Sequence, residues 1–268
     1  MMHLFNLVLW TSGLFIHPDP TIPATGDFCN IRNTAFKSGE SVKMTVYYST
    51  LGAYIGAGDA IFNTTVERMN GKPVYHVVGQ GSTYSFFDNF FKVRDKYESY
   101  FDTATLQPYK FIRNVDEGGY KVYNNVSFNH AANTAVSNNG IFKITDCIQD
   151  VLSAVYYARN IDFNKYKPGD RIPFDMYLDD EVYHLYIRYM GKEKIKTRYG
   201  KFNAIKIKPL LVKGTIFKGG EDMNAWLSDD PNHLLLRAES PIAVGSIKVD
   251  MMGYQNLRYP LTSFIGIR

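Results

Sequence analysis

The chain has 268 residues, of which 45% are hydrophobic and 21% are charged, as in an ordinary globular protein with a core of its own. Its formal net charge is only +4, from 30 basic and 26 acidic residues. The longest basic cluster, 192–198, alternates basic side chains with apolar and acidic ones, which is typical of the solvent-facing side of a strand. We therefore do not expect a nucleic-acid surface, which needs a broader basic footprint.

The first apolar segment, 4–16, has the length of the hydrophobic region of a signal peptide and is too short to span a bilayer comfortably. Ala24 and Gly26 have the spacing of a signal-peptidase site, which predicts a signal peptide over 1–26 and a single β-rich domain over 27–268. Because no Lys or Arg precedes the apolar run, the alternative is a short segment that belongs to the fold. We expect a periplasmic or otherwise exported protein with no transmembrane span in the mature chain.

The chain has two cysteines, Cys29 and Cys147. In an oxidising compartment they could form one disulfide, which would contribute about 4–5 kcal/mol in the chain-entropy model because the loop is long. The alternative is two separate free thiols. The sequence does not distinguish these two states, because it does not give the distance between the cysteines.

From residue 42 onward, segments of period-two alternation recur with turn signals between them, as in antiparallel strands. One of these segments carries Gly56 and Gly58 on one face, which indicates sharp curvature of the sheet or the close approach of another element. The turns at 70–73 and 116–119 are strong hairpin signals. The predicted strands are 42–48, 54–62, 74–78, 91–101, 108–115, 120–128, 171–178, 181–190, 194–199, 202–209, 224–227, 234–239 and 242–251.

One segment has a helical rather than a strand-like spacing of its apolar residues. In 146–160 the apolar residues follow i, i+3, i+4, i+7 spacing, which predicts an amphipathic helix. Asp146, with Gln149 three residues later, resembles a capping box at its start.

About a dozen strands and one helix define the predicted architecture. A large antiparallel sheet has to curl or close, because an open, flat sheet leaves exposed edges. The predicted fold is mainly β, with a large curved antiparallel sheet that forms an open or incomplete barrel around one mid-chain α-helix. No low-complexity linker follows residue 30, so we expect no domain boundary there.

Several stretches share a pattern with a known family. They are Cys29 with Asn33–Glu40, Val93–Tyr100, Pro108–Arg113 with Glu117–Tyr120, Asp146–Arg159, and Trp226–Asp230 with Ser240–Lys248. Together they resemble the exported bacterial proteins catalogued as domain of unknown function 3108, over roughly Cys29 to Tyr254. The resemblance implies an envelope protein of Gram-negative bacteria without an established activity. By fold analogy it also implies an incomplete barrel like that of periplasmic lipoprotein carriers.

The motifs of common enzymes and cofactor sites are missing from the sequence: it has no nucleophile elbow, phosphate loop, dinucleotide fingerprint or zinc-protease motif. We therefore expect no catalysis, cofactor or metal. The run 229–233 could ligate a cation, but its residues are also those of a tight turn, which we favour. Asp95, Glu98 and Asp102 could pair for acid–base chemistry, but Glu98 should face away from Asp95 on a strand.

A more promising set consists of polar side chains on faces expected to point inward. Asp95 shares a face with Tyr97, and a buried carboxylate needs a partner, which Arg113 or Arg159 could supply. On the predicted helix, a polar stripe lies beside the apolar one. These groups form either a structural network or the polar end of a cavity for an amphiphile. The candidate binding residues are Asp95, Tyr97, Arg113, Gln149, Ser153, Tyr156 and Arg159.

The leading functional prediction is a non-enzymatic envelope protein that binds or carries a hydrophobic or amphipathic ligand such as a lipid or acyl chain. One alternative is a structural or interaction module that docks on an envelope protein through strand edges or aromatic patches. A further alternative is an envelope enzyme such as a glycan hydrolase, which needs two carboxylates at suitable separation in a cleft.

Overall fold

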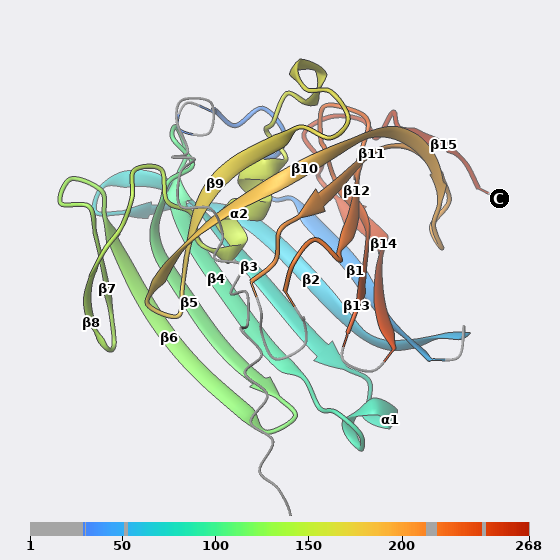
Figure 1. Cartoon of the computed structure of the whole chain (residues 1–268), viewed down its shortest axis with the longest axis horizontal. Helices are drawn as coiled ribbons and strands as arrows, with labels where there is room; N and C mark the ends of the chain where they lie inside the picture. The colour runs from blue at the N-terminus through green and yellow to red at the C-terminus, as the bar shows by residue number, and fades with distance from the viewer. Residues whose placement is uncertain (1–28, 30, 51–52, 213–218, 243–244, 268) are drawn as a thin grey trace, which may run out of the picture.

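A computed structural model of the chain describes residues 29, 31–50, 53–212, 219–242 and 245–267. Fifteen strands of this part form one antiparallel sheet, accompanied by two α-helices and one 3-10 helix, η1 (Figure 1). The signal peptide predicted over 1–26 lies outside the described residues. The elements are β1 Ser41–Thr50, β2 Ala53–Met69, β3 Lys72–Thr83, α1 Ser85–Asp88, β4 Arg94–Asp102, β5 Pro108–Glu117, β6 Tyr120–Asn129, β7 Thr134–Ser137, β8 Gly140–Lys143, α2 Val151–Ala158, η1 Phe163–Lys165, β9 Arg171–Leu178, β10 Glu181–Lys196, β11 Lys201–Pro209, β12 Asn224–Ser228, β13 Leu235–Pro241, β14 Ser246–Gln255 and β15 Phe264–Gly266.

The strands pair in the order β8-β7-β6-β5-β4-β3-β2-β1-β14-β13-β12-β11-β10-β9, and β15 pairs with β11. Two-residue turns with positive φ connect the early hairpins: Asn70 (51°) and Gly71 (79°) lie between β2 and β3, and Gly118 (60°) and Gly119 (92°) lie between β5 and β6. Such turns match the twist of antiparallel strands, which explains the strong hairpin signals in the sequence.

The sheet is joined across its middle by β1, which pairs with β2 on one side and with β14 on the other. Ser41 lies opposite Gln255 in this second pairing, so strands from near both ends of the chain are neighbours. The early meander β1–β8 and the late strands β9–β14 are thereby parts of one continuous sheet.

The sheet curls into an incomplete barrel, which confirms the predicted fold class (Figure 1). The two end strands, β8 and β9, are not hydrogen-bonded to each other. Side chains bridge the gap instead: Asn139 Nδ2 donates to Asp180 Oδ2 at 2.6 Å, and the ring of Tyr177 meets that of Phe128 edge-on at 5.7 Å.

Helix α2 is shorter than predicted. Asp150 is its N-cap, with a carboxylate that accepts hydrogen bonds from the backbone N–H groups of Leu152 and Ser153, both at 2.8 Å. The predicted start near Asp146 was wrong because Gln149 forms a parallel bridge with Met176 of β9 and is therefore extended. The capping box is Asp150 with Ser153, whose hydroxyl accepts from the Asp150 N–H at 2.8 Å.

Aromatic side chains fill the space between α2 and the concave face of the sheet. Tyr156 and Tyr157 of the helix are 3% and 1% exposed. The ring centroid of Tyr156 lies 4.8 Å from that of Phe36 and 6.0 Å from that of Phe101. This part of the interior is a packed core, in which rings cross at the tilted and edge-on angles that aromatic pairs prefer.

Other differences from the predicted elements have local causes. The predicted strands 181–190 and 194–199 are one strand, β10, with a bulge at Gly191, where φ is 103°. The predicted strand 91–101 begins only at Arg94, because a turn follows α1. Strands β7, β8 and β15 were not predicted, since they are only three or four residues long.

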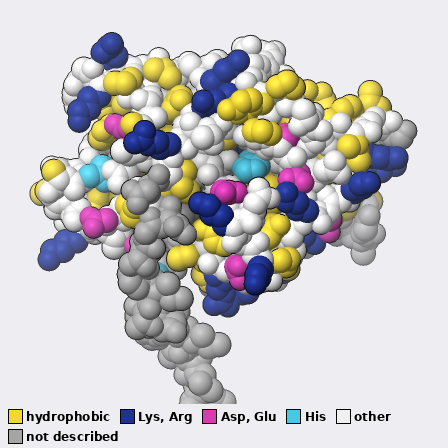
Figure 2. All heavy atoms as spheres, turned by 90° about the horizontal axis from the view of Figure 1, so that it is seen from above, with side chains coloured by type: hydrophobic (Ala, Val, Ile, Leu, Met, Phe, Trp, Pro, Cys, Tyr) yellow, Lys and Arg dark blue, Asp and Glu magenta, His cyan; other side chains and the backbone are white. Residues whose placement is uncertain are grey.

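Two further observations describe the exterior. Seen from above, the end of the barrel nearest α2 shows basic and acidic side chains interspersed with apolar ones (Figure 2). Within the described ranges, no helix combines the length and the apolar character needed to cross a membrane.

Candidate functional site

The α2 candidates lie in the packed half of the interior. The Tyr156 and Thr64 hydroxyls share a hydrogen bond at 2.9 Å, and burial raises the pKa of Tyr156 to about 12. Ser153 belongs to the helix cap. Gln149 precedes the helix; its Nε2 donates to the Cys147 carbonyl at 3.4 Å, and its buried Oε1 has no hydrogen-bond donor among the described residues. Tyr156 therefore fastens α2 to β2, whereas the Ser153 and Gln149 side chains bond within the helix cap and the segment before it.

Arg159 caps the other end of α2 in a buried ion pair. Its Nη1 and Nη2 donate to the two carboxylate oxygens of Glu40 at 2.5 and 3.0 Å. Its Nε donates to the Asn232 carbonyl at 3.1 Å, and the guanidinium lies 5.3 Å from the ring centroid of Phe36. The prediction that Arg159 could neutralise Asp95 was therefore wrong: its carboxylate partner comes from the start of β1.

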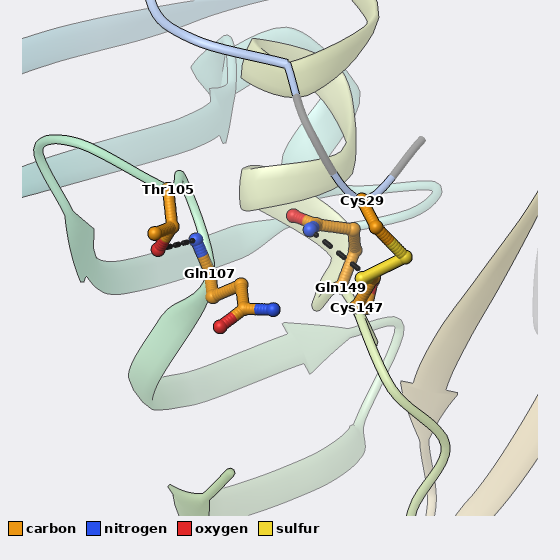
Figure 3. The surroundings of a disulfide bond; sticks show 5 residues. All are labelled: Cys29, Thr105, Gln107, Cys147 and Gln149. Carbon is orange, nitrogen blue, oxygen red and sulfur yellow. Dashed lines mark hydrogen bonds between the residues drawn. A yellow bond between two sulfur atoms is a disulfide. The ribbon is translucent and has the colours of Figure 1, made fainter. Parts of the chain in front are cut away.

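A disulfide between Cys29 and Cys147 lies beside the approach to α2 (Figure 3). It joins residues 118 positions apart, with Cα atoms 5.2 Å from each other. Cys147 has a φ of 59°, so the chain turns there before Gln149 joins β9. The bond fixes the segment ahead of β1 to the connection between the early meander and the helix.

Two glycines of β3 mark where the packed half of the concave face ends. A Cβ on Gly79 would lie 2.9 Å from the Phe62 ring and 3.6 Å from Leu152 of α2, so this position faces the helix and is filled. Gly81 lies two residues further along the same face of the strand. A Cβ on Gly81 would have no described atom within 4 Å. Open space therefore begins between these two positions.

This open half is lined by small and polar residues. Gly81 pairs with Ala60 of β2 on one side and with Asp95 of β4 on the other, and these two are only partly buried. Tyr97 and Glu117 share this face by strand alternation and register. We define the open half as the part of the concave face formed by Ala60, Gly81, Asp95, Tyr97, Arg113 and Glu117.

Asp95 and Glu117 form an acidic pair in the open half. Partial burial raises the pKa of Asp95 to about 7, and the nearby charge of Glu117 and a hydrogen bond to it add to this effect. A hydrogen bond from the Asp116 N–H to Asp95 Oδ1 (3.2 Å) acts in the opposite direction but does not outweigh them. A nearby carboxylate and partial burial both disfavour the charged form, so Asp95 holds its proton at a pH where an ordinary aspartate has lost it. The predicted cationic partner was wrong: Asp95 contacts a second acid.

Arg113 and Tyr97 form the wall beside this pair. Arg113 Nε and Nη2 donate to Asn124 Oδ1 at 3.0 and 2.7 Å, and Nη2 also donates to Asp179 in the β9–β10 turn. Arg113 thereby helps to close the gap between the two ends of the sheet. The ring of Tyr97 lies 6.2 Å from that of Phe111, and burial raises its pKa.

The remaining acidic candidates have structural partners. Glu98 lies on the other face of β4, where its carboxylate binds His76 Nε2 at 3.0 Å. Asp102 accepts from the Tyr109 hydroxyl at 2.7 Å and from the N–H of Ala104, also at 2.7 Å. In the 229–233 run, Asp230 accepts from the Asn232 and Ser263 N–H groups, which makes it the organiser of a turn.

Two concavities elsewhere fit an apolar ligand poorly. A space of about 50 Å³ beside Val155 of α2 is apolar but holds no more than a few waters. A concavity of about 230 Å³ over β10 and β11 is lined mainly by charged residues, among them the Lys192–Asp229 ion pair (2.9 Å).

Most of the chain matches the sequence model of one protein family. The model of the family described as "Protein of unknown function (DUF3108)" matches residues 43–252, from β1 to β14. The chain belongs to the DUF3108 family. No curated protein matches it in sequence.

One solved structure shows the fold of this DUF3108 chain, and two others are more distantly similar. A β-barrel-like DUF1849 protein from Brucella abortus superposes with a TM-score of 0.57 at 7% identity, over 84% of this chain and 99% of that one. An exported-type protein with a YmcC-like fold from Bacteroides fragilis gives 0.35 at 11% identity (84% and 99%), and a candidate lipoprotein from Parabacteroides distasonis gives 0.37 at 13% (84% and 100%). The first of these shows the shared fold.

Sequence reasoning missed part of the candidate site. Glu117 was assigned to a hairpin loop, although its separation from Arg113 is even and places both on one face of a strand. Gly81 stands two residues after Gly79, the same glycine spacing that drew notice at Gly56 and Gly58. Glu40 gave no such signal, because its partner is fixed only by tertiary structure.

Proposed function

We propose that this DUF3108 protein is an exported, non-catalytic binding protein that holds an amphiphile in the open half of its barrel. The observation that carries the proposal is the space over Gly81 that no described residue fills, bordered by Ala60 on one side and the Asp95–Glu117 pair on the other. Here Ala60, Gly81 and the Tyr97 ring would supply the apolar surface and the acidic pair the few polar groups that a ligand site usually combines. The signal-peptide-like segment and the Cys29–Cys147 bond support export, since disulfides persist in oxidising compartments.

The acidic pair favours one class of head group. A ligand carboxylate or phosphate beside Asp95 and Glu117 would meet like charge, whereas a protonated amine would favour the charged form of Asp95 and lower its raised pKa. Arg113 does not reverse this preference, because its guanidinium is already bonded to Asn124 and Asp179. We therefore propose an amphiphile with an amine-bearing or hydroxyl-rich head.

The carboxyl pair gives less support to the alternative of a glycan hydrolase. Glycosidases hold their two carboxyls about 5 Å or more apart, so that a sugar or a water fits between them. Asp95 and Glu117 are instead hydrogen-bonded to each other. A binding role agrees better with this spacing.

The test uses purified protein and two pyrene-labelled probes, a long-chain alkylamine and a fatty acid of the same length. Gly81→Phe should fill the open half and abolish alkylamine binding, since the new side chain points into empty space and leaves the core intact. The matched control is Gly253→Phe on β14, where an added Cβ meets only the Lys43 Cβ at 3.9 Å. The wild type should bind the amine more tightly than the acid. Equal binding by Gly81→Phe and wild type would refute the site.

A further inference from the structure

An aromatic cluster lies at the end of the sheet next to the open half. Helix α1 and the turn after it connect β3 to β4, and none of the residues of α1 is buried. Phe86 and Phe90 are 67% and 74% exposed. Large apolar side chains that are exposed side by side form the kind of patch that marks an interaction site. Figure 1 shows α1 at the far end of the β3–β4 hairpin from α2. We define the aromatic tip as Tyr84, Phe86, Phe90, Phe91 and Tyr120, all at least 41% exposed.

The side chains and turns of the tip pack against one another. The Phe86 ring lies 5.6 Å from that of Phe90, so the two rings pack on each other. The turn beneath them is held by Gly118, whose N–H donates to the Lys92 carbonyl at 2.8 Å. The ring of Phe91 occupies the position that a side chain on Gly118 would need, at 2.5 Å from the ideal Cβ. The β3–β4 and β5–β6 turns therefore form one surface.

The charges around the tip suit the interface of a lipid bilayer. Asp88, the acid within α1, is paired with Arg94 at 2.6 Å, and Asp116 is paired with Lys121 at 3.5 Å. Lys92 is exposed and forms no ion pair with any described residue. Its long side chain can reach lipid phosphates while the rings beside it enter the apolar region. Tyrosine and phenylalanine with flanking lysine are typical of residues at a membrane surface.

The tip also adjoins the open half. Glu117 precedes Gly118, against which Phe91 packs, and Asp95 follows Arg94 at the start of β4. A surface in contact with the rings of the tip would therefore lie next to the acidic pair. Figure 1 shows α1 protruding at the end of the β3–β4 hairpin. Such a protrusion suits a fluid bilayer better than a rigid partner, which would need a matching groove.

We propose that the aromatic tip inserts into the interface of a lipid bilayer and places the open half against the membrane. The proposed membrane contact depends only on the residues in and around the tip. The further idea that the contact brings a ligand to the open half rests on the proposed function. The expected partner is a bilayer with anionic phosphates at its surface, attracted by Lys92 and entered by Phe86 and Phe90. Each phenylalanine should strengthen binding about threefold to tenfold, from the apolar area that it removes from water.

The test is vesicle flotation of the purified protein with phosphatidylethanolamine–phosphatidylglycerol vesicles. The wild type should float with the vesicles, and Phe86→Ser/Phe90→Ser should lose at least about tenfold in apparent affinity. The control is Ile141→Ser in β8, a 72% exposed apolar side chain on another hairpin, which should float like the wild type. Neither substitution removes a buried group, so thermal unfolding should stay unchanged and report correct folding.

The outcomes separate this proposal from the ligand site. Phe86→Ser/Phe90→Ser should still bind the soluble alkylamine probe, whereas Gly81→Phe should still float. Equal flotation of the tip variant and the wild type would overturn the membrane contact. Failure of the wild type to float would also overturn the membrane contact, and a protein would then be the expected partner of the tip. Loss of probe binding in Gly81→Phe is a separate result that bears only on the site.

Discussion

Glu40 and Arg159 form a two-point ion pair in the core, although they are 119 residues apart in the sequence. Their side chains are 0% and 5% exposed, and the pair ties the end of α2 to the first strand of the sheet. Both carboxylate oxygens are bonded to the guanidinium, so each charge is compensated at the cost of removing both from water. The position of α2 over the concave face depends on this contact.

Removing one partner of this ion pair should destabilise the folded protein. Arg159→Leu leaves the Glu40 carboxylate buried without its cation, and we expect a loss of about 3–5 kcal/mol in the free energy of unfolding. Urea denaturation followed by circular dichroism measures it. Lys192→Met, which breaks the exposed ion pair with Asp229, should cost about 1 kcal/mol or less. Similar losses in the two variants would contradict the importance of the buried pair.

The cap of α2 gives a second prediction. Asp150→Ala removes the acceptor for the N–H groups of Leu152 and Ser153 and leaves the buried Ser99 hydroxyl, 2.5 Å from Asp150 Oδ2, without its partner. We expect a loss of about 2–4 kcal/mol from the cap and the unsatisfied hydroxyl together. Asp150→Asn keeps an acceptor oxygen and should lose less. Thermal unfolding of both variants checks the order, and equal losses would argue against the cap.

The raised pKa of Asp95 makes stability depend on pH. Between about pH 4 and 7 the unfolded chain has lost the Asp95 proton while the folded chain retains it, so stability falls as pH rises, and the full cost is present above pH 7. Asp95→Asn avoids this cost and should be more stable than the wild type at pH 8 by about 1–2 kcal/mol, after allowance for solvent screening. At pH 4 the difference should be small.

Urea denaturation of the wild type and Asp95→Asn across this pH range tests the acidic pair. The exposed Asp222→Asn serves as the control and should show no such trend relative to the wild type. A difference between Asp95→Asn and the wild type that grows toward low pH would have the wrong sign and would contradict the raised pKa of Asp95.

The disulfide gives a further stability prediction. Reduction, or Cys29→Ser with Cys147→Ser, opens a loop of 118 residues and should cost about 4–5 kcal/mol in the chain-entropy model. Mass spectrometry after alkylation, with and without reductant, counts the thiols, and urea denaturation gives the cost. Alkylation of both cysteines without reductant would show that the bond is missing from the folded protein.

The sheet could be predicted because strand alternation and turn chemistry are local properties. Gly58 shows how far this reasoning reaches: the predicted close approach is confirmed, since a Cβ there would lie 2.3 Å from the Ser82 carbonyl oxygen. The start of α2 could not be fixed locally, because Asp146 with Gln149 and Asp150 with Ser153 have the same spacing. Only the pairing of Gln149 with β9 decides between them.

The site was harder to predict than the fold. Alternation placed Asp95 and Tyr97 on one face, but the identity of the group beside Asp95 depends on the register of β4 against β5. That register brings Glu117 near, whereas either arginine had looked suitable from charge alone. Open space is also invisible to sequence patterns, because Gly79 and Gly81 are the same residue on the same face and differ only in what lies above them.

The pairing of β1 with β14 has a consequence for how the molecule is made. Until β14 has been synthesised, both β1 and β13 have an unpaired edge, to which strands of other chains can hydrogen-bond. Contacts between residues so distant in sequence also form slowly. The incomplete chain is therefore most prone to aggregate before β14 pairs with both strands.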